Sequence, residues 1–228
     1  MLAALLPPLT FATLAMAGAH ADAVAHAEAA ASAAGRITTV ALAGTPIPER
    51  AAPGKMSAAA VRAHNARVHA HLGEGLAKRG PRWRHIVVHH TASEWSTLAR
   101  IDAYHRRKFE DPDGIEYHFL IGNGKKRPDG YIERARWDLQ ERSIHLFKPE
   151  GAPDAITISL VGNFHERDMG PRTYEAALGL VVELARRHDV PADRVTTHTR
   201  VDGNLTVCPG KNFPTRRLLS DVAEALAP

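Results

Sequence analysis

The chain has 228 residues, 44% of them hydrophobic, which is enough to bury one substantial core and makes one main domain the default. Charged residues make up 24%, an ordinary share for a globular protein. The net charge of +4 is concentrated near the start: residues 1–80 hold seven Lys or Arg against four Asp or Glu, whereas residues 81–228 hold 22 against 21. The main part of the chain is therefore almost neutral, and its composition does not indicate a nucleic-acid-binding protein.

Residues 1–21 have the pattern of a secretory leader. An apolar run follows the initiator methionine, and Ala19-His-Ala21 fits the small-x-small pattern of a cleavage site. The pair Pro7-Pro8 interrupts this run, and the run is short, which together argue against a stable membrane span. We therefore expect an exported protein, either periplasmic or secreted.

The next segment, residues 22–56, is rich in alanine and then in proline and glycine, which is typical of a flexible linker. Ser57 is a favoured N-cap, and the alanine-rich sequence after it predicts a helix that runs to about Lys78. Because the apolar face of this helix is sparse, we expect residues 57–80 to be peripheral. The breaker Gly80-Pro81 then marks the start of the main domain, residues 81–228.

Within the main domain, short β-type runs alternate with helical patterns. This alternation predicts an α/β fold in which a central mixed β-sheet is flanked by helices. The expected strands are Arg84–His90, Tyr117–Ile121, Tyr131–Glu133, Ile156–Val161 and Val195–Thr197, and the expected helices are Leu98–Phe109, Thr173–His188 and Thr215–Leu226.

Cysteine and histidine residues from separate segments predict a metal site. Cys208 is the only cysteine, His198 lies shortly before it, and the first expected strand ends on the adjacent pair His89-His90. A thiolate and two imidazoles suit zinc, and three protein ligands leave the fourth tetrahedral position for water, as in catalytic zinc sites. Since neighbouring residues of a strand face opposite sides, only one histidine of the pair can point at the metal. The alternative is that these are incidental members of a set of 14 histidines.

Ordered motifs over about residues 83–216 resemble the zinc-dependent N-acetylmuramoyl-L-alanine amidases, a family that includes phage amidase-type lysozymes and peptidoglycan-recognition proteins. Each motif is weak alone, but their order and spacing together make a strong signal. The resemblance implies that His89, His198 and Cys208 are the zinc ligands, and it selects His89 from the histidine pair. The motifs are Val88-His-His-Thr-Ala92, Tyr117-His-Phe-Leu-Ile-Gly-Asn123, Asp129-Gly-Tyr-Ile-Glu133, Ile158-Ser-Leu-Val-Gly-Asn-Phe164, Thr197-His198 and Thr206-Val-Cys-Pro-Gly210.

Tyr117 matches the family's tyrosine beside the zinc-bound water. A phenol there could orient or help to deprotonate that water, and could donate a hydrogen bond to the developing tetrahedral intermediate. The alternative is an aromatic side chain that only packs on its strand. Glu116 is a rival general base, but strand alternation would turn it away from the face that carries Tyr117.

Two further residues match family positions near the substrate. Thr206 corresponds to a position where members carry Lys or Thr near the scissile carbonyl, and its hydroxyl could donate to the oxyanion. An equally good interpretation is a hydroxyl that stabilises its own loop. His145 lies in the loop before the strand at Ile156–Val161, where the family places a substrate-contacting histidine.

The resemblance implies hydrolysis of the amide between N-acetylmuramic acid and L-alanine of the stem peptide, by water activated on Zn²⁺. The expected partner is therefore peptidoglycan or a muropeptide, with no nucleic acid, and we expect a monomer. One alternative is a non-catalytic peptidoglycan-binding module of the same fold, against which the three retained candidate ligands argue. Another is a related zinc amide hydrolase for a different N-acylated peptide, which loops such as Arg136–Asp154 would decide.

Overall fold

The computed structural model describes residues 55–72, 83–110, 114–135, 154–201 and 205–228. In this part of the chain five strands form one sheet, in the order β3-β2-β4-β1-β5. Strands β2, β4, β1 and β5 run parallel, and β3 runs antiparallel to β2 at the edge. The predicted mixed sheet is thus confirmed. The strands are β1 (His85–His90), β2 (Phe119–Ile121), β3 (Ile132–Arg134), β4 (Ala155–Leu160) and β5 (Val195–Thr197).

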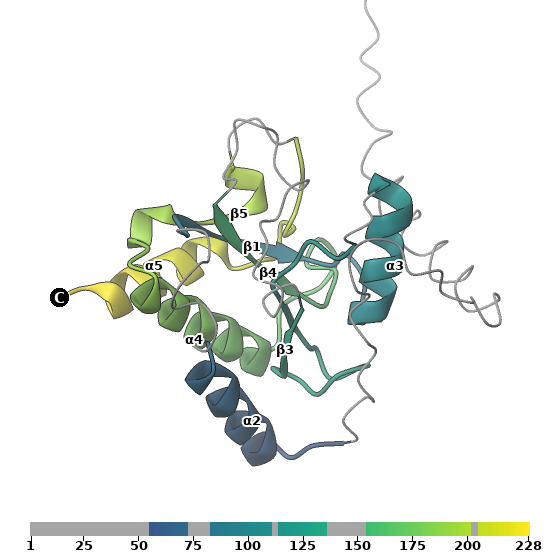
Figure 1. Cartoon of the computed structure of the whole chain (residues 1–228), viewed down its shortest axis with the longest axis horizontal. Helices are drawn as coiled ribbons and strands as arrows, with labels where there is room; N and C mark the ends of the chain where they lie inside the picture. Colours follow the sequence, from purple (N-terminus) through teal and green to yellow (C-terminus); the bar gives the residue numbers. More distant parts are fainter. Residues whose placement is uncertain (1–54, 73–82, 111–113, 136–153, 202–204) are drawn as a thin grey trace, which may run out of the picture.

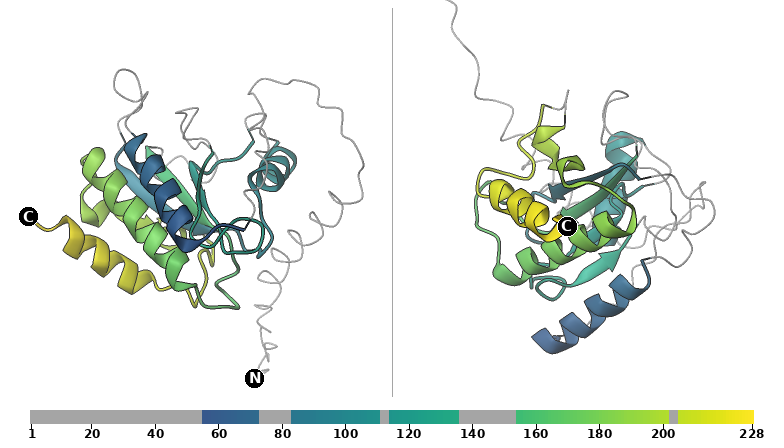
Figure 2. Two further views of the ribbon diagram at one scale, coloured as in Figure 1. Left: turned by 90° about the horizontal axis from the view of Figure 1, so that it is seen from below. Right: turned by 90° about the vertical axis from the view of Figure 1, so that its left-hand side faces the viewer.

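Helices flank both faces of this sheet, as the sequence predicts. Helices α4 and α5 cover one face and α3 lies over the other, while α2 lies beside the edge strand β3 (Figure 1, Figure 2). None of the helices in the described ranges is long and apolar enough to cross a membrane. The helices are α2 (Ala58–Ala70), α3 (Leu98–Phe109), α4 (Pro171–Arg187) and α5 (Thr215–Leu226), with single 3₁₀ turns η2 (Ala192–Arg194) and η3 (His198–Arg200).

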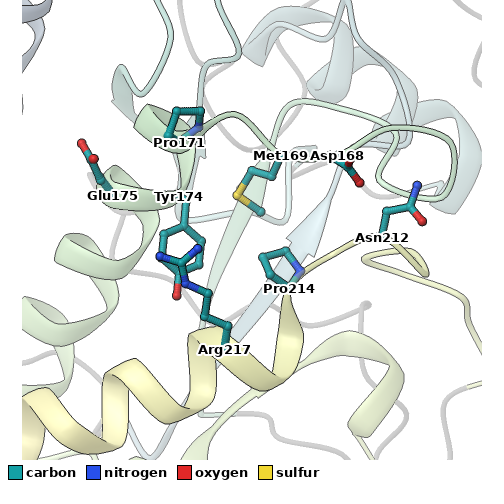
Figure 3. Close-up of a pocket in the computed structure, with 8 residues that line it drawn as sticks. All are labelled: Asp168, Met169, Pro171, Tyr174, Glu175, Asn212, Pro214 and Arg217. Atoms are coloured by element: carbon teal, nitrogen blue, oxygen red, sulfur yellow. The ribbon is translucent and has the colours of Figure 1, made fainter.

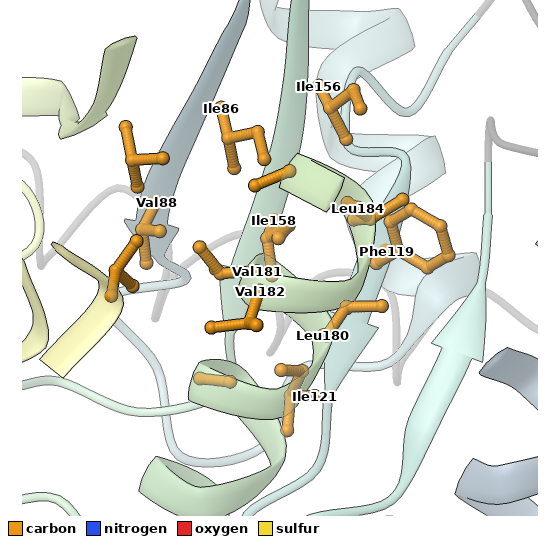
Figure 4. Packing of buried hydrophobic residues seen from close by; sticks show 14 of the residues in the cluster. Ile86, Val88, Phe119, Ile121, Ile156, Ile158, Leu180, Val181, Val182 and Leu184 are labelled. Carbon is orange, nitrogen blue, oxygen red and sulfur yellow. The ribbon is translucent and has the colours of Figure 1, made fainter. Parts of the chain in front are cut away.

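The main hydrophobic core lies between the sheet and helices α4 and α5. Alternate residues of a strand share one face, so Ile86 and Val88 of β1 point to the same side. They meet the apolar stripe of α4, including Leu180 and Leu184 (Figure 4). These side chains are almost fully removed from water, which stabilises the fold by about 1.5–3 kcal/mol for each large one.

Helix α3 packs against the opposite face of the sheet, where its Leu98 and Ile101 cluster with Leu120 of β2. Thr97 caps its first turn by accepting a hydrogen bond from the backbone N–H of Arg100 at 3.3 Å. Its buried residues follow the spacing i, i+3, i+4 and i+7 of a helical stripe. Two members of this stripe, Asp102 and His105, are polar. The other two are Leu98 and Ile101.

Helix α2 begins where the sequence predicts, since Ser57 accepts a hydrogen bond from the N–H of Ala60 at 3.2 Å. It ends at Ala70, before the expected Lys78, and residues 73–82 lie outside the described ranges. Its Val68 belongs to the main core. The Asn65 side chain also bonds two backbone groups beside β3 and so covers part of that sheet edge.

The strand expected at Tyr117–Ile121 is shorter than predicted, because β2 begins only at Phe119. Just before it, the N–H of His118 still donates to the carbonyl of Thr157 at 2.9 Å, but side chains make the other hydrogen bonds between these segments. The N–H of Thr157 donates to Nδ1 of His118 at 2.9 Å, and the Thr157 hydroxyl donates to the carbonyl of Glu116 at 2.8 Å. Competition of this kind between side chains and the backbone ladder ends regular pairing.

Several expectations fall on residues that the structure does not describe. The leader at residues 1–21, nearly all of the linker at 22–56 and the candidate groove residue His145 lie outside the described ranges. They stay predictions from the sequence.

Candidate metal centre and active site

The register of two parallel strands brings His89 and His198 together. β1 and β5 are neighbours, and Val88 of β1 pairs with Thr197 of β5. The residue after each member of this pair is a histidine, His89 or His198, so both imidazoles lie at the same level of the sheet. Their ring centroids lie 4.5 Å apart.

Cys208 reaches the same place on a loop that follows η3. The N–H of Thr199 donates to the carbonyl of Cys208 at 2.8 Å, which ties the loop to the turn that starts at His198. Gly210 has φ +107°, and a Cβ there would overlap the backbone of Phe164. Glycine therefore lets the loop lie directly against the segment after β4.

The three candidate ligands form one cluster. One donor atom from each of His89, His198 and Cys208 lies within 4.8 Å of the other two, and the Cys208 Sγ is 3.8 Å from Nδ1 of His89. His90 turns the other way, because its Nδ1 accepts a hydrogen bond from the N–H of Phe164 at 3.2 Å. Its backbone reaches the cluster instead, with the N–H 3.4 Å and the carbonyl oxygen 3.9 Å from Sγ.

The protonation of this cluster follows from burial. Burial, aided by the neighbouring His198 and His90, holds the pKa of His89 well below its usual value, so the ring is neutral and keeps a lone pair. Burial also raises the pKa of the Cys208 thiol to about 12, although the His90 N–H opposes this rise. A soft set of two imidazoles and one thiol, which gives up its proton when a cation binds, fits Zn²⁺.

The phenol ring of Tyr117 lies beside this cluster, with its centroid 5.3 Å from that of His89. Burial raises the pKa of Tyr117 well above its ordinary value, and negative charge on Cys208 adds to the rise, whereas Ser159 opposes it. The phenol therefore keeps its proton near neutral pH and is a hydrogen-bond donor.

Asp102 and His105 of α3 are not among the residues that the sequence motifs point to, yet they hold the segment that carries Tyr117. Asp102 Oδ1 accepts from the N–H of Ile115 at 2.9 Å, and His105 Nδ1 accepts from the N–H of Glu116 at 3.2 Å. The His105 ring also meets the Tyr117 ring edge to face at 5.3 Å. Their signal in the sequence is that two polar residues fall on the buried stripe of α3.

Glu116, the rival base, is fully buried. The strand alternation expected to turn it away from Tyr117 does not apply, because both residues precede β2. Both polar groups of its backbone are hydrogen-bonded. The N–H donates to His105, and the carbonyl accepts from the hydroxyl of Thr157.

Thr206 lies on the same loop as Cys208 and is half-buried. Its hydroxyl oxygen accepts a hydrogen bond from the N–H of Cys208 at 3.1 Å, so it stabilises the loop that presents the thiol. The hydroxyl hydrogen can still be donated elsewhere. The two interpretations of this residue are therefore compatible.

A hollow of about 350 Å³ lies away from this cluster, between the starts of α4 and α5. Figure 3 shows Arg217 facing the ring of Tyr174, and the guanidinium carbon lies 4.4 Å from the ring centroid. The Tyr174 hydroxyl donates to Asp221. None of the candidate site residues lines this hollow.

Known proteins resemble the chain in sequence and in fold. The profile of a family described as N-acetylmuramoyl-L-alanine amidase matches residues 79–211, more than half of the chain. The endolysin N-acetylmuramoyl-L-alanine amidase LysCS from Clostridium intestinale is 29% identical, with a TM-score of 0.52 over 62% of this chain and 84% of its own. LysC from the same organism gives the same identity and TM-score over 62% and 85%. Bumblebee PGRP-SA is 22% identical, with a TM-score of 0.47 over 60% and 80%. A search of curated protein sequences found no match.

Proposed function

The chain belongs to the N-acetylmuramoyl-L-alanine amidase family, and on that premise we propose that it is a zinc-dependent hydrolase of peptidoglycan. It would cleave the amide between N-acetylmuramic acid and L-alanine of the stem peptide. The observation that carries the proposal is the convergence of donor atoms from His89, His198 and Cys208 within 4.8 Å. The relative LysCS is named as an N-acetylmuramoyl-L-alanine amidase, which supports the same reaction. The leader pattern in residues 1–21 supports export to where peptidoglycan lies.

The three residues would hold Zn²⁺, which when bound supplies a Lewis acid and a water molecule of lowered pKa. His89 and His198 would hold the ion as neutral rings, and Cys208 would hold it after losing its proton. The backbone N–H of His90, 3.4 Å from Sγ, then stabilises the negative sulfur.

The chain's own hydrogen-bond donors complete the site. Tyr117 keeps its phenolic proton and donates to the substrate's carbonyl oxygen as negative charge develops there. Thr206 offers a second hydroxyl from the cysteine loop. Because Tyr117 is buried, its hydrogen bond contributes more than it would in solvent.

Mass spectrometry of purified peptidoglycan incubated with the full chain tests this function. We expect free stem peptides that begin with L-alanine, no product after chelation, and recovery when Zn²⁺ is returned. His198→Asn should abolish both bound zinc and product, whereas His71→Asn, at an exposed position after α2, should change neither. Full activity of the metal-free protein would contradict a zinc hydrolase. Cleavage at another bond would contradict the assigned substrate bond.

Recognition without cleavage is the competing function. Loss of a metal ligand would favour it, but this chain keeps all three donors in one cluster. In the same digestion, binding of peptidoglycan without released peptide would favour recognition over hydrolysis.

A further inference from the structure

Trp95 is exposed on the loop between β1 and α3. The side chain is 48% exposed, which makes it one of four large hydrophobic side chains that are exposed within the described ranges. Aromatic side chains contribute strongly to binding when they are buried, so a tryptophan that is half exposed is a candidate contact for another molecule.

The loop that presents Trp95 is held firmly. The Glu94 carboxylate accepts a hydrogen bond from the N–H of Asn163 at 3.0 Å. Asn123 donates to both the carbonyl and the carboxylate of Glu94, at 3.1 Å each. The N–H of Trp95 itself donates to the Ser93 hydroxyl at 3.2 Å. The backbone that carries the ring is therefore held before any ligand arrives, which lowers the entropy cost of ordering this loop on binding.

Two lysines from the β2–β3 connection lie over this ring. The Nζ atoms of Lys125 and Lys126 are each 5.7 Å from the Trp95 ring centroid, within cation–π range. Both lysines are exposed, and their long flexible stems let the ammonium groups move aside for a ligand. One aromatic face and two positive charges thus share a small surface.

We propose that Trp95, Lys125 and Lys126 bind an anionic glycopeptide, with the indole face on a sugar ring and the ammonium groups on carboxylates. Resting on the proposed function, this ligand is the part of the peptidoglycan chain next to the cleaved unit. Trp95 follows His89 by six residues, so their Cα atoms lie at most about 22 Å apart, the length of a fully extended chain. A polymer of sugars and peptides can span that distance.

The charge balance of the main part of the chain favours this ligand over a membrane or a nucleic acid. Residues 81–228 carry 22 basic against 21 acidic residues, whereas binding to polyanionic surfaces depends on a broad positive field. A single tryptophan with two lysines instead matches one sugar and a few carboxylates.

The test compares the full-length protein with Trp95→Ala, Trp95→Phe and the double variant Lys125→Glu/Lys126→Glu. A matched control, Arg186→Glu/Arg216→Glu, makes the same charge change at exposed positions of α4 and α5. Co-sedimentation with purified peptidoglycan sacculi measures binding without turnover, and anionic lipid vesicles serve as the rival surface. Thermal melts check that each variant folds.

We expect Trp95→Ala to bind sacculi about tenfold more weakly, as for loss of an aromatic anchor, with Trp95→Phe in between. The lysine variant should also bind weakly and lose most of the salt dependence of wild-type binding, whereas the arginine control should match wild type. In kinetics, Trp95→Ala should raise KM for long solubilised glycan chains at unchanged kcat, and leave KM for a single muramyl peptide unchanged.

Wild-type binding by both Trp95→Ala and the lysine variant would overturn the proposal. An equal rise in KM for the single muramyl peptide would place Trp95 at the cleaved unit and also overturn it. The proposal would also be overturned if the variants lost binding to lipid vesicles but not to sacculi, because that result would indicate a membrane contact. If the wild type releases no stem peptides, the proposed function fails, while the sacculus binding of the variants still decides this surface.

Discussion

At the scale of single residues, Tyr117 and Cys208 lie in one cluster but perform separable tasks. Cys208 belongs to the group of donor atoms within 4.8 Å, whereas Tyr117 lies beside that group, with its ring next to that of His89. Substitutions at the two positions should therefore differ in their effect on bound metal.

Tyr117→Phe removes one hydroxyl and leaves all three candidate ligands. We expect full zinc content and a loss of about 10²–10³ in kcat, by comparison with removal of a single oxyanion donor. Cys208→Ser exchanges a thiolate for a hydroxyl of far higher pKa and should lose both zinc and turnover. Metal analysis and turnover on the same preparations separate the two. A wild-type rate for Tyr117→Phe would reduce the phenol to packing and bring Glu116 forward as the base.

At the scale of elements, α3 acts as a brace for the catalytic segment. Asp102 and His105 accept hydrogen bonds from two successive N–H groups, those of Ile115 and Glu116, immediately before Tyr117. Gly114 allows this close approach, since its φ is +78° and a Cβ would overlap the Asp102 carboxylate. The position of the phenol thus depends on a helix that contributes none of the candidate metal ligands.

His105→Leu should lower both stability and kcat. It leaves the buried Glu116 N–H without an acceptor, which costs about 1–3 kcal/mol, and it frees the backbone beside Tyr117. His105→Asn, whose side-chain oxygen can stand where Nδ1 stands, should recover most of the kcat. Zinc content should stay at the wild-type level in both. Rates measured well below each melting temperature decide the matter: if His105→Asn is no faster than His105→Leu, the brace is only structural.

At the scale of the whole molecule, one buried and three partly buried histidines link stability to pH. Burial is the largest cause of the lowered pKa of His69, His85, His89 and His188. Between those lowered values and the ordinary value near 6.5, the unfolded chain binds more protons than the folded one. Stability is therefore complete above about pH 6.5 and is lost as the pH falls below it, through the folded-state pKa values.

We accordingly expect the melting temperature of the metal-free protein to fall as the pH drops from about 7.5 to 5. His188→Asn removes one of these groups and should flatten the slope. A melting temperature that rises toward pH 5 would contradict the sign of the linkage. Calorimetry at several pH values, with chelator present throughout, measures this dependence of the melting temperature on pH.

Periodicity and local chemistry were enough to predict most elements. The helix at Leu98–Phe109 has the predicted bounds, because its capping threonine and apolar spacing are local signals. Helix α4 starts at Pro171, two residues earlier than predicted, since proline is well suited to a first helical turn. The start of β2 could not be predicted, because it depends on Thr157, about 40 residues away in sequence.

The sequence alone was enough to predict which residues could bind zinc, since a lone cysteine and a histidine pair can be recognised without coordinates. The family motifs then select His89 from that pair. Only the tertiary structure places these donors together, through the register that pairs Val88 with Thr197. It alone also reveals the brace of Asp102 and His105. Register and buried hydrogen bonds join residues that are distant along the chain, and no local pattern encodes such pairings.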